Sequence, residues 1–188
     1  FREVTDEDDL SEHTKIPCHM VFDVKFDFRR KARLVLQGNC IDPPKEDICS
    51  GVVNMDSVRL AFTITAMNNL NACAADISTA FLYGKAREKV HIIAGKEFGP
   101  LAGKPLIVDK SCCSLKSSTA SFHSNLSEKI RQMGFRPSKM DPNLCIRKAK
   151  DKDYYKMLAC HVDDVVAFLE CLMEIIEEIK KTHMLKGT

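Results

Sequence analysis

Residues 157–169 have the sequence MLACHVDDVVAFL. Apolar residues flank the adjacent carboxylates Asp163 and Asp164 on both sides, which indicates a hairpin of two buried strands with charge at its turn. Aspartate is common in turns because its side chain bonds to nearby backbone. Two negative charges between buried strands are nevertheless costly unless something compensates them. A divalent cation would do so, since hard cations prefer carboxylate oxygens.

A third carboxylate stands in a similar place. Asp76 follows the apolar residues 72–75 and precedes Ile77, so a charge ends another short buried strand. Three carboxylates brought together would suit a site for phosphoryl transfer with two metal ions. The residues alone leave an alternative open, in which Asp76 caps a turn and Asp163 and Asp164 form a solvated hairpin tip.

Periodicity and turn residues outline the other elements of the chain. Strands are expected at 20–26, 31–37, 73–77, 90–93, 144–147, 154–160 and 165–169, and helices at about 57–70, 117–133 and 170–182. The first helix is capped by Asp56 or Ser57 and has Leu60, Ile64 and Met67 on one apolar face. Residues 39–51 and 94–105 are rich in proline and glycine and are expected to be loops. Strands mixed with helices without strict alternation favour an α+β fold.

Composition and charge narrow the function classes. The formal net charge is only +2, but residues 25–33 hold five of the basic side chains, and such a local stripe can bind phosphate. A solvated turn is the plainer interpretation of the same stripe. None of the nine cysteines forms a Cys-x-x-Cys pair, so a zinc site has little support, and their apolar surroundings suit a reducing compartment. No apolar run approaches the roughly 20 residues of a membrane span.

Five segments, in order, resemble the reverse transcriptase of copia-type long-terminal-repeat retrotransposons. They cover nearly the whole chain from about residue 16. The segments are Lys31-Ala32-Arg33-Leu34-Val35, Asp76-Ile77-Ser78-Thr79-Ala80-Phe81-Leu82, the degraded stretch from Lys110 to His123, Gly134-Phe135-Arg136-Pro137-Ser138-Lys139-Met140-Asp141-Pro142, and His161-Val162-Asp163-Asp164. They are similar to the family's Lys-Ala-Arg-Leu-Val, Asp-Val-x-x-Ala-Phe-Leu, Leu-Tyr-Gly-Leu-Lys, Gly-Phe-x-x-Ser-x-x-Asp-Pro and Tyr-Val-Asp-Asp motifs.

The resemblance implies an RNA-directed DNA polymerase that works by two-metal nucleotidyl transfer. Asp76, Asp163 and Asp164 would be its catalytic residues and would hold two Mg²⁺ or Mn²⁺ ions. Lys31 and Arg33 match the positions that grip the incoming triphosphate, a task that suits both cations.

Further residues acquire roles from the same resemblance. Phe81 matches the aromatic residue under the nucleotide sugar, where a ring would exclude a ribose 2′-hydroxyl; an ordinary core aromatic is the alternative. His161, Lys116 and Ser117 match positions that seat primer and template. The chain departs from the family at His161, which replaces a tyrosine, and at Ser114, which replaces a glycine. Loss of that glycine removes backbone freedom that the turn needs.

The resemblance also implies an architecture. We expect a polar lead-in at 1–15 and polymerase fingers and palm over 16–188, with fingers mainly at 16–55 and palm mainly at 56–188. The palm sheet would be antiparallel with helices on one face, and the thumb would be absent. Because the chain begins at Phe1, we expect a fragment of a longer protein.

Partners and competing functions complete the expectations. The partners would be an RNA or DNA template with its primer, deoxynucleoside triphosphates and the rest of the retrotransposon polyprotein, without a membrane. The location would be intracellular, either cytoplasmic in a virus-like particle or nuclear. Two alternatives are a catalytically inactive remnant or domesticated nucleic-acid-binding module, and an unrelated α+β interaction domain.

Overall fold

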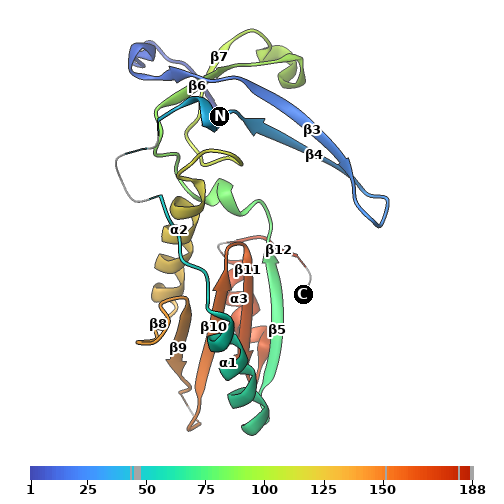
Figure 1. Ribbon diagram of the computed structural model, residues 1–188, viewed down its shortest axis with the longest axis vertical. Coiled ribbons are helices and arrows are strands. Elements are labelled where there is room, and N and C mark those ends of the chain that lie inside the picture. Colours follow the sequence, from blue (N-terminus) through green and yellow to red (C-terminus); the bar gives the residue numbers. More distant parts are fainter. Residues whose placement is uncertain (43, 45–47, 151, 182, 187–188) are drawn as a thin grey trace. The chain divides into compact units, whose positions relative to one another are not determined.

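A computed structural model of the chain describes residues 1–42, 44, 48–150, 152–181 and 183–186 (Figure 1). These residues form two compact units, one made of residues 1–49 and 81–122 and the other of residues 50–80 and 123–188. Residues 81–122, expected mainly within the palm, cluster here with the N-terminal residues. Pro43, expected within a loop, lies outside the described residues. In the described part of the chain, no helix is both long and apolar enough to cross a membrane.

The first unit is built on a four-stranded sheet of order β1-β7-β6-β2. Its strands are β1 (Arg2–Glu3), β7 (Pro105–Ile107), β6 (Val90–Ile93) and β2 (Thr14–Lys15), accompanied by the 3-10 turns η1 (Leu10–Glu12), η2 (Gly38–Cys40), η3 (Ala80–Tyr83) and η4 (Lys96–Leu101). Buried apolar residues, among them Ile16, Ile92 and Leu106, form its core. The expected polar lead-in supplies two of the strands, β1 and β2, and its residues are exposed or half-buried.

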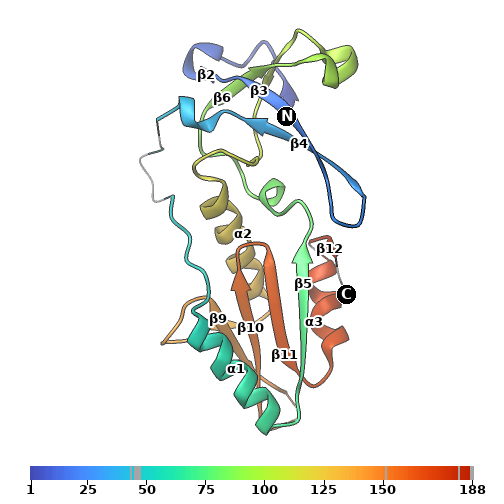
Figure 2. The same ribbon diagram turned by 45° about the vertical axis from the view of Figure 1, so that its right-hand side comes forward.

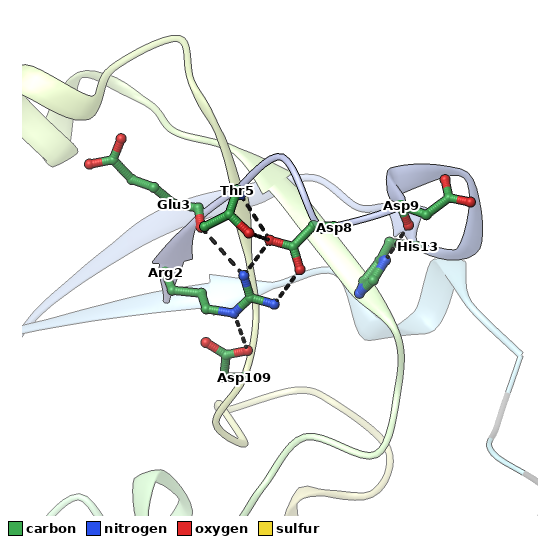
Figure 3. Close-up of polar contacts among 7 residues, drawn as sticks. All are labelled: Arg2, Glu3, Thr5, Asp8, Asp9, His13 and Asp109. Atoms are coloured by element: carbon green, nitrogen blue, oxygen red, sulfur yellow. Dashed lines mark hydrogen bonds and ion pairs between the residues drawn. The ribbon is translucent and has the colours of Figure 1, made fainter.

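A polar cluster holds this N-terminal segment in place (Figure 3). The Arg2 guanidinium donates to Asp8 at 2.5 and 2.6 Å and to Asp109 at 3.1 Å. Thr5 donates its N–H and its hydroxyl to Asp8, both at 2.8 Å. The hydrogen bond from Arg2 is the largest of the effects that hold the pKa of Asp8 far below its usual range. Through Arg2, the carboxylates of Asp8 and Asp109 therefore fasten β1 to the end of β7.

A separate two-stranded hairpin belongs to the same unit. β3 (Cys18–Val24) pairs antiparallel with β4 (Arg30–Leu36), from Cys18 opposite Leu36 to Val24 opposite Arg30. This confirms the strands expected at 20–26 and 31–37, which pair as a hairpin with the basic residues around its tip. Leu36 is fully buried at the base, whereas β3 is exposed from Val21 onwards.

The second unit is built on a six-stranded sheet of order β12-β5-β11-β10-β9-β8. Its strands are β12 (Leu185–Lys186), β5 (Asn71–Ile77), β11 (Asp164–Leu169), β10 (Tyr155–His161), β9 (Leu144–Lys148) and β8 (Arg136–Pro137), and every neighbouring pair is antiparallel. The expected antiparallel sheet is confirmed. The predicted strands of residues 157–169 lie at its centre, where apolar residues are buried.

Helices cover both faces of this sheet (Figure 2). Phe62 of α1 (Met55–Met67) packs edge-on against Phe168, with ring centroids 4.9 Å apart. Lys156, which points to the opposite face, donates to Glu174 of α3 (Leu172–Lys180) at 2.7 Å. The expectation of helices on one face is therefore wrong. The physical reason is that β10 is buried on both sides, so each face needs a cover.

The remaining α-helix described, α2 (Ser118–Gln132), begins in the first unit and ends in the second. Its C-terminal part lies near the segment after α3, since His183 Nε2 is 3.3 Å from Asn125 Oδ1. Burial of His183 lowers its pKa.

Candidate active site

The aspartate pair stands at a two-residue hairpin turn. His161 ends β10 and lies opposite Asp164, which begins β11, so the turn itself consists of Val162 and Asp163. Val162 has a φ of 51°, in the left-handed region. A β-branched residue is strained there, and strained backbone is found preferentially at functional sites.

The register of the sheet brings Asp76 directly opposite Asp164. The Ile77 N–H donates to the Asp163 carbonyl at 2.8 Å. This bond joins the residues next to Asp76 and Asp164, so Asp76 and Asp164 themselves form a non-hydrogen-bonded pair of the antiparallel ladder. Opposed side chains approach most closely at such pairs, with Cβ atoms about 4.5–5.5 Å apart. Like charges placed directly opposite destabilise a sheet. The fold therefore places three aspartates at one end of two neighbouring strands. The repulsion between their charges has to be offset by a positively charged group.

The three carboxylates are exposed. Among the described residues, no group of three or more His, Cys, Asp or Glu side chains is gathered closely enough to hold a metal ion. The chemistry of the donors fits hard divalent cations. The backbone thus supplies the residues at one place, while their side chains are not arranged as a closed ligand set.

Lys31 and Arg33 lie on β4 in the first unit. They are two residues apart on one strand, so they share a face of the hairpin, opposite Asp23 and Val21 of β3 respectively. Arg33 is exposed and Lys31 is half-buried. The pair therefore presents two cations on one side of the hairpin.

Comparison with known proteins shows which family the chain belongs to. A family model described as reverse transcriptase (RNA-dependent DNA polymerase) matches residues 5–187. The chain belongs to this reverse transcriptase family. It is 27% identical over 163 residues to a retrovirus-related Pol polyprotein from transposon TNT 1-94 of Nicotiana tabacum, covering 80% of this chain and 12% of that protein.

Yeast relatives give the same result. The chain is 26% identical over 187 residues to the transposon Ty1-DR4 Gag-Pol polyprotein of Saccharomyces cerevisiae, covering 96% of this chain and 11% of that protein. The chain thus spans about a tenth of the length of these curated relatives, 12% of the first and 11% of the second. The relatives support the resemblance to copia-type elements.

Phe81 of this reverse transcriptase chain is half-buried just after β5. Its ring packs edge-on against Phe122, with centroids 6.4 Å apart. A partly exposed ring fits a surface under a nucleotide sugar, and the contact with Phe122 also fits an ordinary core aromatic. Both interpretations of Phe81 remain compatible with its place.

Lys116 and Ser117 turn inward. Ser117 is fully buried, and its N–H and hydroxyl donate to Glu88 at 2.8 and 2.6 Å. Lys116 Nζ donates to the Ile41 carbonyl at 2.6 Å. The Ser117 hydroxyl is therefore already taken up by Glu88 in the interior, and its expected role in seating primer or template stays a prediction. Both residues hold the chain just before α2.

Sequence reasoning missed Glu88 in this arrangement. It lies between Arg87 and Lys89, in a charged run that is typical of a solvated loop. Yet Glu88 is 8% exposed and satisfies donors of Ser117, 29 positions away. No local signal distinguishes such a carboxylate from its solvated neighbours.

The missing glycine of the family motif has a visible consequence at Ser114. Ser114 has a φ of 83°, in the left-handed region that favours glycine. A Cβ added to Gly38 would lie 2.1 Å from the Ser114 carbonyl oxygen, so the two backbones touch. The turn therefore requires the freedom that the sequence lacks at position 114.

Proposed function

We propose that this chain is the polymerising part of a retrotransposon reverse transcriptase, which carries out RNA-directed DNA synthesis by two-metal nucleotidyl transfer. The single observation that carries the proposal is the pairing of Asp76 with Asp164 at a non-hydrogen-bonded position of the sheet, beside Asp163 at the turn. β5 and β11 are far apart in the sequence, and their register sets Asp76 opposite Asp164. The pairing of the two strands does not itself need a carboxylate at either position.

The carboxylates would hold Mg²⁺ or Mn²⁺. Because the three side chains are exposed, they can rotate about their side-chain bonds to meet an ion. When bound, two ions supply the charge that activates a primer 3′-hydroxyl and stabilises the leaving pyrophosphate. Asp76 and Asp164 would share one face, and the strained turn at Val162 would fix the direction of Asp163.

The remaining roles follow from the family. The first unit would serve as fingers and the second as palm. Lys31 and Arg33 would bind the triphosphate of the incoming nucleotide, and Phe81 would exclude ribonucleotides. His161, exposed at the end of β10, would lie beside the primer terminus. The partners would be a template with its primer, deoxynucleoside triphosphates and the rest of the polyprotein.

Thermal melting with and without Mn²⁺ tests the metal site. Wild-type protein should melt at higher temperature in Mn²⁺, since an ion that binds only the folded state adds about 2.7 kcal/mol at 100 times its dissociation constant. Asp163→Asn and Asp76→Asn should lose most of this shift, because an amide oxygen is a neutral and weaker ligand. Equal shifts in wild type and both variants would contradict the proposal.

The control is Asp153→Asn, which makes the same chemical change elsewhere in the same unit. Asp153 precedes β10, at the end of that strand remote from His161, and its carboxylate lies 3.2 Å from Lys148 Nζ. Asp153→Asn should keep the full Mn²⁺ shift. Asp151 would be an obvious control from the sequence, but it lies outside the described residues.

Primer extension separates an active enzyme from a remnant. Any extension should disappear in Asp76→Asn and Asp163→Asn. Replacing His161 by tyrosine and Ser114 by glycine, the residues that the family has there, should raise it. A metal-dependent shift without extension, before and after these replacements, would identify a remnant that keeps its metal site.

A further inference from the structure

The tip of the β3–β4 hairpin displays aromatic rings to solvent. Phe22, Phe26 and Phe28 are 75%, 105% and 88% exposed. A single exposed apolar residue is ordinary, but three phenylalanines within seven positions form a patch, and such patches mark interaction sites. The hairpin therefore has a surface whose exposure the fold itself does not explain.

The tip is an ordered turn. The Lys25 N–H donates to the Arg29 carbonyl at 2.9 Å, and the Phe28 N–H donates to the Lys25 carbonyl at 2.8 Å. Asp27 accepts from Arg29 Nε at 2.6 Å. Phe28 has a φ of 62°, which is a strained conformation for a bulky residue. Backbone bonds and an ion pair thus hold Phe28 in a position that its own preferences oppose.

The hairpin separates rings from the expected triphosphate cations. Phe22 lies opposite Ala32, whereas Lys31 and Arg33 are the neighbours of Ala32 along β4 and so point to the other face. At the tip, Lys25 and Arg30 add positive charge beside Phe26 and Phe28. Rings interleaved with cations have the chemistry of a base-stacking platform. Arg30 lies opposite Val24 and so shares with Phe22 the face away from Lys31 and Arg33.

We propose that Phe26 and Phe28, with Phe22 beside them, stack on unpaired bases of a single-stranded nucleic acid while Lys25 and Arg30 contact its phosphates. Stacking tolerates any base sequence because every base has a π-face, and duplex bases are not available to it. The inference rests on the proposed function, since a reverse transcriptase copies a strand that is unpaired ahead of synthesis. It assigns to these rings a site separate from the carboxylates and from Lys31 and Arg33.

Fluorescence anisotropy of the full chain, without metal or nucleotide, tests the stacking. The probes are a single strand of about 16 nucleotides, an abasic strand of equal length and a blunt duplex. The double variant Phe26→Ser with Phe28→Asn removes both rings, and asparagine tolerates the left-handed φ at position 28. Affinity for the single strand should fall at least about fivefold. Affinity for the abasic strand should stay unchanged, because the phosphates and cations remain.

The control is Tyr155→Ser, which removes an aromatic ring that is 54% exposed in the second unit. It should leave binding of all three probes unchanged. Equal losses for the normal and abasic strands, or unchanged binding of the normal strand, would overturn the stacking. Co-sedimentation with anionic phospholipid vesicles that is lost in the double variant, with oligonucleotide binding intact, would assign the rings to a lipid surface and also overturn it.

The double variant also distinguishes this inference from the proposed function. The Mn²⁺ melting shift depends on Asp76 and Asp163 and should be equal in the double variant and wild type. If stacking fails while that shift persists, only the inference falls. If the shift is absent in wild type while ring-dependent binding persists, only the polymerase proposal falls.

Discussion

Two antiparallel hairpins of similar length behave in opposite ways in this protein. β3–β4 is a two-stranded ribbon whose outer part is exposed, whereas β10–β11 lies in the middle of a six-stranded sheet and is buried along most of its length. Each carries charged residues at or near its turn. In β3–β4 the charges are solvated at little cost, and in β10–β11 the aspartates stand beside buried strands.

This difference shows that the surroundings of a hairpin determine which roles its residues can take. A two-stranded ribbon is only marginally stable by itself, so β3–β4 depends on the packing of its base. Its outer residues are not needed for that packing and are free to contact ligands. β10–β11 is supported by neighbours on both edges and by helices on both faces, so it can carry strain at Val162 and repulsion between Asp76 and Asp164.

The largest expected contrast is between two phenylalanines. Phe168→Ala should destabilise the fold by about 3–5 kcal/mol, because the ring is fully buried and packs against Phe62. Phe22→Ala on β3 should change stability by less than about 0.5 kcal/mol, since that ring is 75% exposed. Urea denaturation measures both. A similar loss in the two variants would break the comparison.

A smaller effect is expected where the exposed hairpin joins its unit. Gly38 follows β4, and an added Cβ would meet the Ser114 carbonyl oxygen at 2.1 Å. Gly38→Ala should therefore cost about 1–3 kcal/mol through backbone displacement. Hydrogen exchange should show faster opening of β3–β4, with β10–β11 unchanged. Equal protection of β3–β4 in variant and wild type would show that this junction does not hold the hairpin.

Relieving strain at the same junction should have the opposite sign. Ser114→Gly should stabilise by about 1 kcal/mol, because glycine adopts a φ of 83° without a steric penalty. Ser127→Gly, inside α2, is the control and should destabilise, since glycine disfavours helix. Thermal melting gives both signs. Destabilisation by Ser114→Gly would mean that the serine side chain matters more than the backbone angle.

The smallest expected effect is a pH dependence confined to the six-stranded sheet. Burial lowers the pKa of His183, so the folded state disfavours the charged imidazole. Below the ordinary value of 6.5 the unfolded chain binds more protons, and stability falls as pH drops through the lower folded pKa. β12 follows His183 closely in the chain and pairs with β5. Hydrogen exchange of the β5 amides should therefore become faster over this pH range, and His183→Gln should reduce this dependence on pH. The β3–β4 amides should show no change beyond intrinsic exchange.

The strands of the two hairpins were predictable because their sequences have a clear pattern. Alternation marks β3, and continuous apolar runs mark β10 and β11. The short strands outside that prediction, each of two or three residues, are too short to have any period; they are β1, β2, β7, β8 and β12. They exist because a neighbouring backbone pairs with them, which a local pattern cannot show.

α1 illustrates how tertiary packing overrides a pattern. Its large residues Leu60 and Met67 form a stripe but are 57% and 79% exposed, whereas Ala61 and Thr65 are buried. Small side chains let the helix approach the sheet closely, so the helix turns a less hydrophobic side inward. Its cap is Asn54, which accepts from the Asp56 N–H, rather than Asp56 or Ser57.

The sequence by itself determined the α+β class, the two hairpins and the resemblance that leads to the reverse transcriptase family. It did so because strand periodicity and motif order are local properties that survive in one chain. Only the tertiary structure decided that Asp76 lies opposite Asp164, that Ser117 is bound by Glu88 and that helices cover both faces of the sheet. Those facts depend on register and burial between segments far apart in the chain, and a shift of one residue in register would turn Asp76 to the other face.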